Sequence, residues 1–247
     1  MFSPKINPHS KHPPILHRPN GNITIIEHFQ RVCLIEVIDT CREYSQCDTK
    51  GYDDPMNSIE MLEKKIRTLE SLLAQVQEKH GESFSVSAKV FAEALKSGNT
   101  IFWCGNGGSA AESSHLAVEL IGRFKNNRRP LPSVSINSDT SALTCIANDF
   151  GYDEIFARQL EGLAKMGDVL VVLSTSGKSE NVLRALRKAK EIGVVTIALL
   201  GKGGGQALDL ADHSIVIDST ETARIQEIHL LLGHTFCEYA EMDMGFE

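Results

Sequence analysis

His115 and Glu119 are two side chains able to transfer protons or bind a metal, and they stand four residues apart. On a helix this spacing brings both onto one face, so they can converge on one ion or one substrate. Arg123, one further turn along, is suited to pairing with Glu119 or holding a sugar oxygen, and equally to an ordinary surface ion pair. These residue types point to proton transfer or metal binding.

A glycine-rich segment, CGNGGSA at 104–110, stands just before this pair and follows an apolar run. Glycines let the backbone approach a ligand closely, and a helix N-terminus presents free N–H groups and the positive end of a dipole. The segment therefore suits an anion or a polar sugar, although a plain turn between a strand and a helix would use the same glycines. Neither the GxGxxG nor the GxxxxGK[ST] spacing occurs, so no nucleotide fingerprint is present.

A second cradle, STSGKS at 174–179, also joins an apolar run to a helical stretch. Its hydroxyls donate hydrogen bonds without charge, and the helix dipole favours an anion, which together suit a phosphate. Lys178 could add positive charge, whereas Ser179 could simply cap the helix. Two such cradles in one sheet favour the ligand-binding interpretation.

The elements that position these segments follow from the spacing of apolar residues. Helical periodicity begins at Ser58, the expected N-cap, and a second helix is predicted at about 86–96. Five short apolar runs then alternate with helical patterns before a last amphipathic helix at about 222–242, which predicts an α/β fold with a five-stranded parallel sheet flanked by helices. In such sheets ligands bind beyond the carboxyl ends of the strands, where both cradles fall. The predicted strands are 100–104, 132–136, 168–174, 194–200 and 213–217.

Composition limits the function classes. The 247 residues are 42% hydrophobic and 23% charged, as in an ordinary globular protein with one sizeable domain. A formal charge of −7 works against nucleic-acid binding. With no apolar run of about 18 residues and no apolar core of a secretory signal near the start, we expect a cytoplasmic protein without a membrane partner. The six cysteines form no CxxC pair and are expected to be reduced thiols.

Residues 1–55 differ from the rest of the chain. Five of the eight prolines fall within the first twenty residues, which prevents regular structure there. The apolar stretch 22–38 is compatible with a strand or a short helix, but turn residues follow it. We expect 1–55 to be a poorly ordered extension, either lineage-specific or due to an upstream start, and 56–247 to be the functional domain.

Taken together, the two cradles resemble the sugar isomerase (SIS) domain, a phosphosugar-binding α/β sandwich, and this resemblance implies a flavodoxin-like sheet. Within that superfamily, the stretch from about Met61 to Glu241 resembles the phosphoheptose isomerase family. The resemblance covers nearly all of the chain after residue 55. It rests on five segments that are specific for the family when they occur together, although none of them is specific alone. They are CGNGGSAAESSHLAVELIGRF, CIANDFGYDEIF, STSGKSENV, LLGKGGG and ARIQEIHLLLGH.

The resemblance implies a zinc site at His115, Glu119, Gln226 and His234, with Glu119 and His234 as the proton-transfer pair. Gln226 and His234 stand eight residues apart, roughly 12 Å along a helix, so a metal would have to lie between them or draw on two subunits. Ala223 replaces an Asp found in some members, so no carboxylate supports catalysis there. The implied substrate-binding residues are Asn106, Gly107, Gly108, Glu119, Asn148, Asp149, Ser174, Thr175, Ser176, Ser179 and Gln226.

The implied activity is aldose–ketose isomerisation of D-sedoheptulose 7-phosphate to D-glycero-D-manno-heptose 7-phosphate, a phosphorylated seven-carbon sugar, by a homotetramer. One alternative is a non-catalytic SIS-fold protein that binds a partner, of the type associated with the bacterial replication initiator, in which the Glu and the last His are replaced. Glu119 and His234 are both present here, which favours the enzyme. The other alternative is isomerisation of a different ketose phosphate, because a phosphate-binding pocket does not discriminate between sugars of different chain length.

Overall fold

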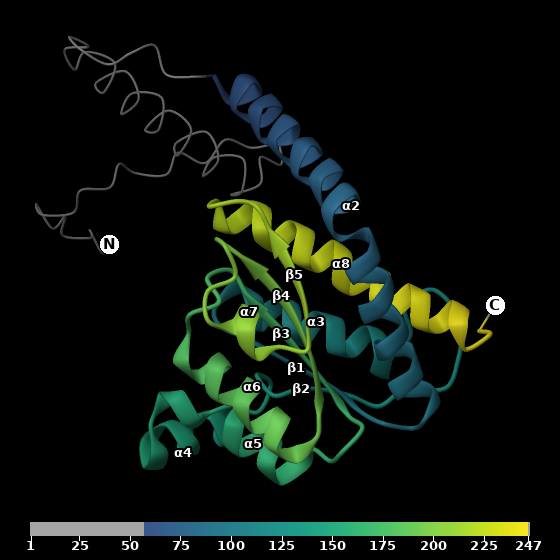
Figure 1. Cartoon of the computed structure of the whole chain (residues 1–247), viewed down its shortest axis with the longest axis vertical. Helices are drawn as coiled ribbons and strands as arrows, with labels where there is room; N and C mark the ends of the chain where they lie inside the picture. The colour runs from purple at the N-terminus through teal and green to yellow at the C-terminus, as the bar shows by residue number, and fades with distance from the viewer. Residues whose placement is uncertain (1–56, 247) are drawn as a thin grey trace, which may run out of the picture. The chain divides into compact units, whose positions relative to one another are not determined.

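The computed structural model describes residues 57–246 (Figure 1). Their central element is a parallel sheet of five strands in the order β2-β1-β3-β4-β5, the order of flavodoxin-like folds. The predicted fold class is confirmed, and every predicted strand end lies within one residue of the observed one. The strands are Ile101–Gly105 (β1), Ser133–Ser135 (β2), Val169–Ser174 (β3), Val195–Gly201 (β4) and His213–Ile217 (β5).

Helices cover both faces of the sheet. On one face α2, α3 and α8 share an apolar cluster with the strands, and on the other α4, α5, α6 and α7 share a second one. In Figure 1, α8 and α2 lie side by side along the first face. The helices are α2 (Ser58–Lys96), α3 (Gly108–Ile121), α4 (Thr140–Phe150), α5 (Ala157–Leu163), α6 (Glu180–Ile192), α7 (Ala207–Leu210) and α8 (Thr222–Asp243), with a 3₁₀ turn at Tyr152–Glu154.

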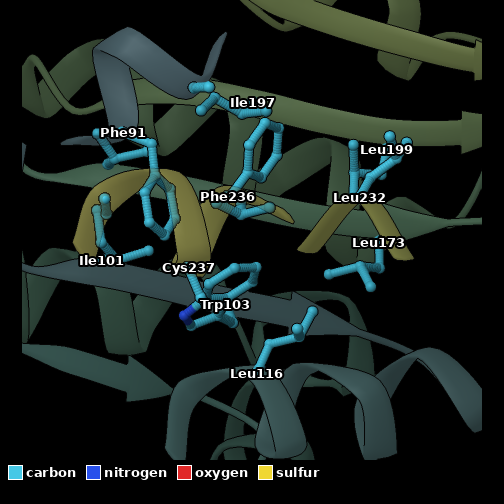
Figure 2. Close-up of a cluster of buried hydrophobic side chains, with 14 of the residues drawn as sticks. Phe91, Ile101, Trp103, Leu116, Leu173, Ile197, Leu199, Leu232, Phe236 and Cys237 are labelled. Carbon is cyan, nitrogen blue, oxygen red and sulfur yellow. The ribbon is translucent and has the colours of Figure 1, made fainter. Parts of the chain in front are cut away.

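The sequences of the strands are continuous apolar runs because both faces of the sheet are buried. Alternate side chains of β3 point to opposite faces, so Val171 and Leu173 join the first cluster while Leu170 and Val172 join the second. Figure 2 shows the first cluster, where side chains of α2, α3 and α8 meet those of the strands. This packing fixes α3 and α8 against the sheet.

One prediction about the N-terminal helices is wrong. The two predicted helices are a single helix, α2, of 39 residues. Gly81 costs about 1 kcal/mol relative to Ala but keeps its N–H, so it weakens a helix without ending it. The N-cap is Asn57 rather than Ser58, since Asn57 accepts from the backbone of Ile59 and Glu60 and forms a capping box with Glu60.

Within residues 57–246, none of the helices combines the length and apolarity needed to cross a bilayer. Cys104, Cys145 and Cys237 are free thiols, as predicted for them. Burial raises the pKa of the Cys104 and Cys237 thiols, which keeps them protonated. The other three cysteines and the predicted extension 1–55 lie outside the described residues.

Candidate active site

The two predicted cradles lie side by side because their strands are neighbours. β1 pairs directly with β3, and Gly105 at the end of β1 is in register with Leu173. The glycine loop after β1 and the serine loop after β3 therefore leave the same edge of the sheet together. This is the edge where parallel α/β sheets bind ligands.

The glycine loop needs its glycines for two different reasons. Gly107 has φ of +56°, a conformation that strains other residues. A Cβ on Gly108 would lie 2.3 Å from Nε2 of Gln226, so α8 comes close to the start of α3. The structure thus brings Gln226 to the glycine loop, although Gly108 and Gln226 are 118 positions apart in the chain.

His115, Glu119 and His234 form one cluster. His115 Nε2 lies 3.4 Å from Glu119 Oε1 and 2.9 Å from Nε2 of His234. In this hydrogen bond one imidazole must donate and the other accept. At least one of the two Nε2 atoms therefore has a lone pair directed into the cluster. One nitrogen or oxygen of each residue falls within 4.8 Å of the others. The cluster can exchange protons with a ligand or hold a cation.

The environment of His234 favours its neutral form. Burial lowers the pKa of His234, the neighbouring His115 lowers it further, and Glu119 opposes both. The Phe124 ring stacks on the imidazole, with the centroids 5.3 Å apart and the planes 14° from parallel. A neutral imidazole can accept a proton or bind a metal near neutral pH.

Two asparagines connect the cradles. Asn106 of the glycine loop and Asn181 of α6 each donate to the other's side-chain oxygen at 2.9 Å. The Tyr152 hydroxyl also donates to the Asn106 oxygen at 2.9 Å. Asn181 is buried and holds Asn106 in one orientation. Asn181 and Tyr152 were not among the residues predicted from the sequence, although both lie in the segments that carry the family resemblance.

The serine loop is held partly by its own hydroxyls. Ser174 Oγ accepts from the backbone of Gly177 at 3.1 Å, and Ser176 Oγ accepts from that of Lys178 at 3.3 Å. Ser179 is the N-cap of α6, yet its side chain accepts no capping hydrogen bond from that helix. Simple capping therefore does not account for the Ser179 hydroxyl, which, like Thr175, is only partly buried.

Three predicted residues stand apart from the histidine cluster. Asn148 and Asp149 are exposed near the end of α4 and are hydrogen-bonded to each other at 2.7 Å. Arg123 is exposed and joins none of the ion pairs found among residues 57–246, while Glu119 faces His115 instead. No bond within the described part of the chain ties these three side chains to the cluster.

Comparison with known proteins shows the family of this chain. The SIS domain family model matches residues 66–201. A phosphoheptose isomerase of Nitratiruptor is 50% identical over 72% of this chain and 96% of its own length. The chain belongs to the phosphoheptose isomerase family. A phosphoheptose isomerase of Aquifex aeolicus is 44% identical over 74% of this chain and 96% of its own length.

Solved structures of this family share the fold. The phosphoheptose isomerase of Neisseria gonorrhoeae is 35% identical, with a TM-score of 0.71, over 75% of this chain and all of its own. That of Francisella tularensis is 29% identical, with a TM-score of 0.73, over 76% of this chain and all of its own. Family membership thus rests on both sequence and architecture.

In this member of the family, the donor set of the cluster fits a divalent metal. Two imidazole nitrogens and a carboxylate are ligands that zinc accepts in catalytic sites, where three protein ligands leave a position open. His115, Glu119 and His234 supply these from α3 and α8. The amide of Gln226 lies at the glycine loop, on the same helix as His234.

Proposed function

We propose that this chain is a cytoplasmic isomerase that converts D-sedoheptulose 7-phosphate into D-glycero-D-manno-heptose 7-phosphate, a precursor of nucleotide-activated heptose for lipopolysaccharide. The observation that carries the proposal is the meeting of Glu119 with His115 and His234 at the edge of the sheet where the two cradles end. Membership of the phosphoheptose isomerase family supports the same substrate class.

The reaction moves two protons and needs no outside oxidant. As His234 takes a proton from C1 of the ketose, the carboxyl of Glu119 gives a proton to O2, which leaves a cis-enediol. His234 then returns its proton to C2 while Glu119 takes the hydroxyl proton of O1, so the carbonyl moves from C2 to C1. His234 suits the carbon step because its lowered pKa keeps it neutral and able to accept a proton.

The cradles hold the substrate for this exchange. Ser174, Thr175, Ser176 and Ser179 bind the phosphate at the N-terminus of α6, where the helix dipole favours an anion. Asn106, Gly107 and Gly108 hold the sugar, with Asn148, Asp149 and Gln226 as further contacts. Binding energy from the remote phosphate keeps C1 and C2 beside the proton-transfer pair.

Zinc is the proposed cofactor. His115, Glu119, Gln226 and His234 would hold it, and when bound it would polarise the carbonyl oxygen as a Lewis acid. Its binding can be measured without turnover, by titrating the purified protein with zinc after dialysis against a chelator. Loss of one bound ion per subunit in His115→Ala is the expected result.

A homotetramer is the proposed assembly. The first turns of α2 expose Ile59, Leu62 and Ile66, whose exposed fractions are 67%, 61% and 47%. An apolar stripe on a helix is normally buried against a partner surface, and a second copy of this chain would cover it. Light scattering should give a tetramer at micromolar concentration, and a stable monomer would refute this assembly.

A panel of sugar phosphates tests the activity. Purified protein is incubated with five-, six- and seven-carbon ketose phosphates, and the products are followed by NMR. Turnover of the seven-carbon substrate well above the others is expected. Turnover of a shorter ketose phosphate would favour the second alternative, and absence of turnover with all of them would favour a non-catalytic binding protein.

A further inference from the structure

A buried carboxylate on α8 organises the loop after α3. Glu241 is 1% exposed and accepts hydrogen bonds from the backbone N–H groups of Phe124, Lys125 and Asn126, each at 3.1 Å. Burial alone would raise the pKa of Glu241, but these amides and Arg128 together lower it. The carboxylate is therefore charged and has several donors directed at it.

Arg128 links this carboxylate to the end of α3. Its Nε donates to Glu241 Oε1 at 2.7 Å, and both side chains are fully buried. Its two terminal nitrogens donate to the backbone oxygens of Leu120 and Glu119, each at 2.8 Å. One guanidinium thus ties α8 to the last turn of α3, the turn that carries Glu119.

The same network reaches His234 from the other side. Glu241 follows His234 by seven residues on α8, so both project from the same side of that helix. The backbone of Phe124, held by Glu241, places the ring that stacks on the His234 imidazole. One buried ion pair is therefore linked to both groups assigned to proton transfer, to Glu119 through its backbone oxygen and to His234 through Phe124.

We propose that Arg128 and Glu241 are positioning residues, which hold Glu119 and the Phe124–His234 stack at the separation that proton transfer requires. The catalytic role given to this network rests on the proposed function. The inference goes beyond the proposed function in assigning roles to Arg128, Glu241 and Phe124, and no hydrogen bond or ion pair found among residues 57–246 joins these three to the cradles. The network fixes geometry, so its loss should lower kcat more than it raises KM.

A double substitution separates positioning from stability. Glu241→Gln alone leaves a buried guanidinium without a counter-charge, which destabilises the fold by itself. Replacing both members, Arg128→Met with Glu241→Met, keeps similar volume without leaving a charge unpaired, so the fold should survive. The three backbone amides and the Glu119 carbonyl nevertheless lose these partners, and the Leu120 carbonyl keeps only the backbone N–H of Leu131, so the loop and the end of α3 are less firmly held.

The control is a second ion pair of equal length on the same helix. Lys96 and Asp243 pair at 2.7 Å between α2 and α8, and no bond found among residues 57–246 joins either of them to His115, Glu119 or His234. We expect the Arg128–Glu241 double variant to lose at least about tenfold in kcat, with KM within about threefold, and Lys96→Met with Asp243→Met to keep kcat within about twofold. Equal effects from the two double variants would overturn the proposal.

Two further measurements keep the test decisive. Phe124→Leu leaves the ion pair intact and removes only the ring on His234, so it should lower kcat even if the double variant fails to fold; an unchanged kcat would contradict the inference.

Chemical modification of His234 by diethyl pyrocarbonate, followed by peptide mass spectrometry, needs no turnover. It should become several-fold faster in the folded double variant and in Phe124→Leu. An inactive wild type would refute the proposed function, while the His234 modification rates would still decide whether the network holds Phe124 in place.

Discussion

The Nε2 atoms of His115 and His234 lie 2.9 Å apart, although 119 positions separate the two residues in the chain. α3 brings the first to this point and α8 the second, because both helices pack on the same face of the sheet. With Glu119 one turn after His115, the contact assembles nitrogen and oxygen donors from two distant segments.

Loss of the proton-transfer groups should abolish the reaction and spare the fold. His234→Gln and Glu119→Gln keep approximate size and hydrogen bonding but cannot exchange protons near neutral pH. Each should reduce kcat by far more than tenfold, that is, by more than about 1.4 kcal/mol in barrier height. Circular dichroism and phosphosugar binding serve as controls. Retention of more than a tenth of wild-type turnover by both variants would remove them from the mechanism.

The glycine run 203–205 should set the shape of the serine loop. A Cβ on Gly205 would lie 2.6 Å from the backbone oxygen of Gly177 and 2.7 Å from that of Ser176. Gly205→Ala must therefore displace the serine loop, and we expect KM for the sugar phosphate to rise at least about tenfold.

Gly203→Ala is the matched control for that experiment. Gly203 also has positive φ, at +80°, yet a Cβ there would meet no atom within 4 Å. Both variants carry the backbone strain of a left-handed residue, and only Gly205→Ala adds the collision. If the two raise KM equally, contact with the serine loop is not the cause.

The amide pair between the cradles should matter more than the tyrosine that joins it. Asn181→Ala removes both reciprocal bonds to Asn106, whereas Tyr152→Phe removes one bond made by an exposed side chain. One net hydrogen bond contributes about 0.5–1.5 kcal/mol. We expect kcat/KM to fall at least tenfold for Asn181→Ala and two- to tenfold for Tyr152→Phe, measured by steady-state kinetics. The reverse order would contradict the linking role of Asn181.

Acid should destabilise the protein through His229. This residue is fully buried on α8 and contacts the Leu200 carbonyl oxygen at 3.1 Å; burial lowers its pKa from 6.5 to about 4. Between these values the unfolded chain binds more protons than the folded one, so the free energy of unfolding falls as pH drops from 6.5 to 4. At 1.36 kcal/mol per pH unit the loss is on the order of 3 kcal/mol.

Urea unfolding across this pH range measures that effect. His229→Gln retains a donor for Leu200 but does not titrate, so its stability should vary less between pH 6.5 and pH 4 than that of the wild type. His80→Gln, at a half-buried position on α2, is the control and should keep the wild-type dependence. An unchanged slope in His229→Gln would show that other groups cause the acid sensitivity.

Removal of the N-terminal extension should leave turnover intact. A chain that begins at Met56 retains every proposed site residue, since the first of them is Asn106. We expect kcat and the oligomeric state to match those of the full chain. A truncated protein that assembles normally but loses activity would show that the domain boundary at residue 56 is misplaced.

The sequence by itself determined the sheet. Five apolar runs bounded by turn residues predicted strands to within one residue, because strands buried on both faces must be apolar throughout. His115 and Glu119 were likewise paired from their spacing, which the local geometry of a helix dictates. The prediction of two N-terminal helices was wrong, because α2 continues through Gly81, where one glycine costs about 1 kcal/mol and the rest of the helix outweighs it.

Only the tertiary structure decided how distant segments meet. The spacing of eight positions from Gln226 to His234 gave no reason to join either residue to α3. Packing of α8 nevertheless places Gln226 against Gly108 and His234 against His115. The links Asn106–Asn181 and Arg128–Glu241 are also long-range contacts between ordinary polar residues. Periodicity reports which face of an element is buried, whereas the partner across a contact depends on how whole helices pack on the sheet.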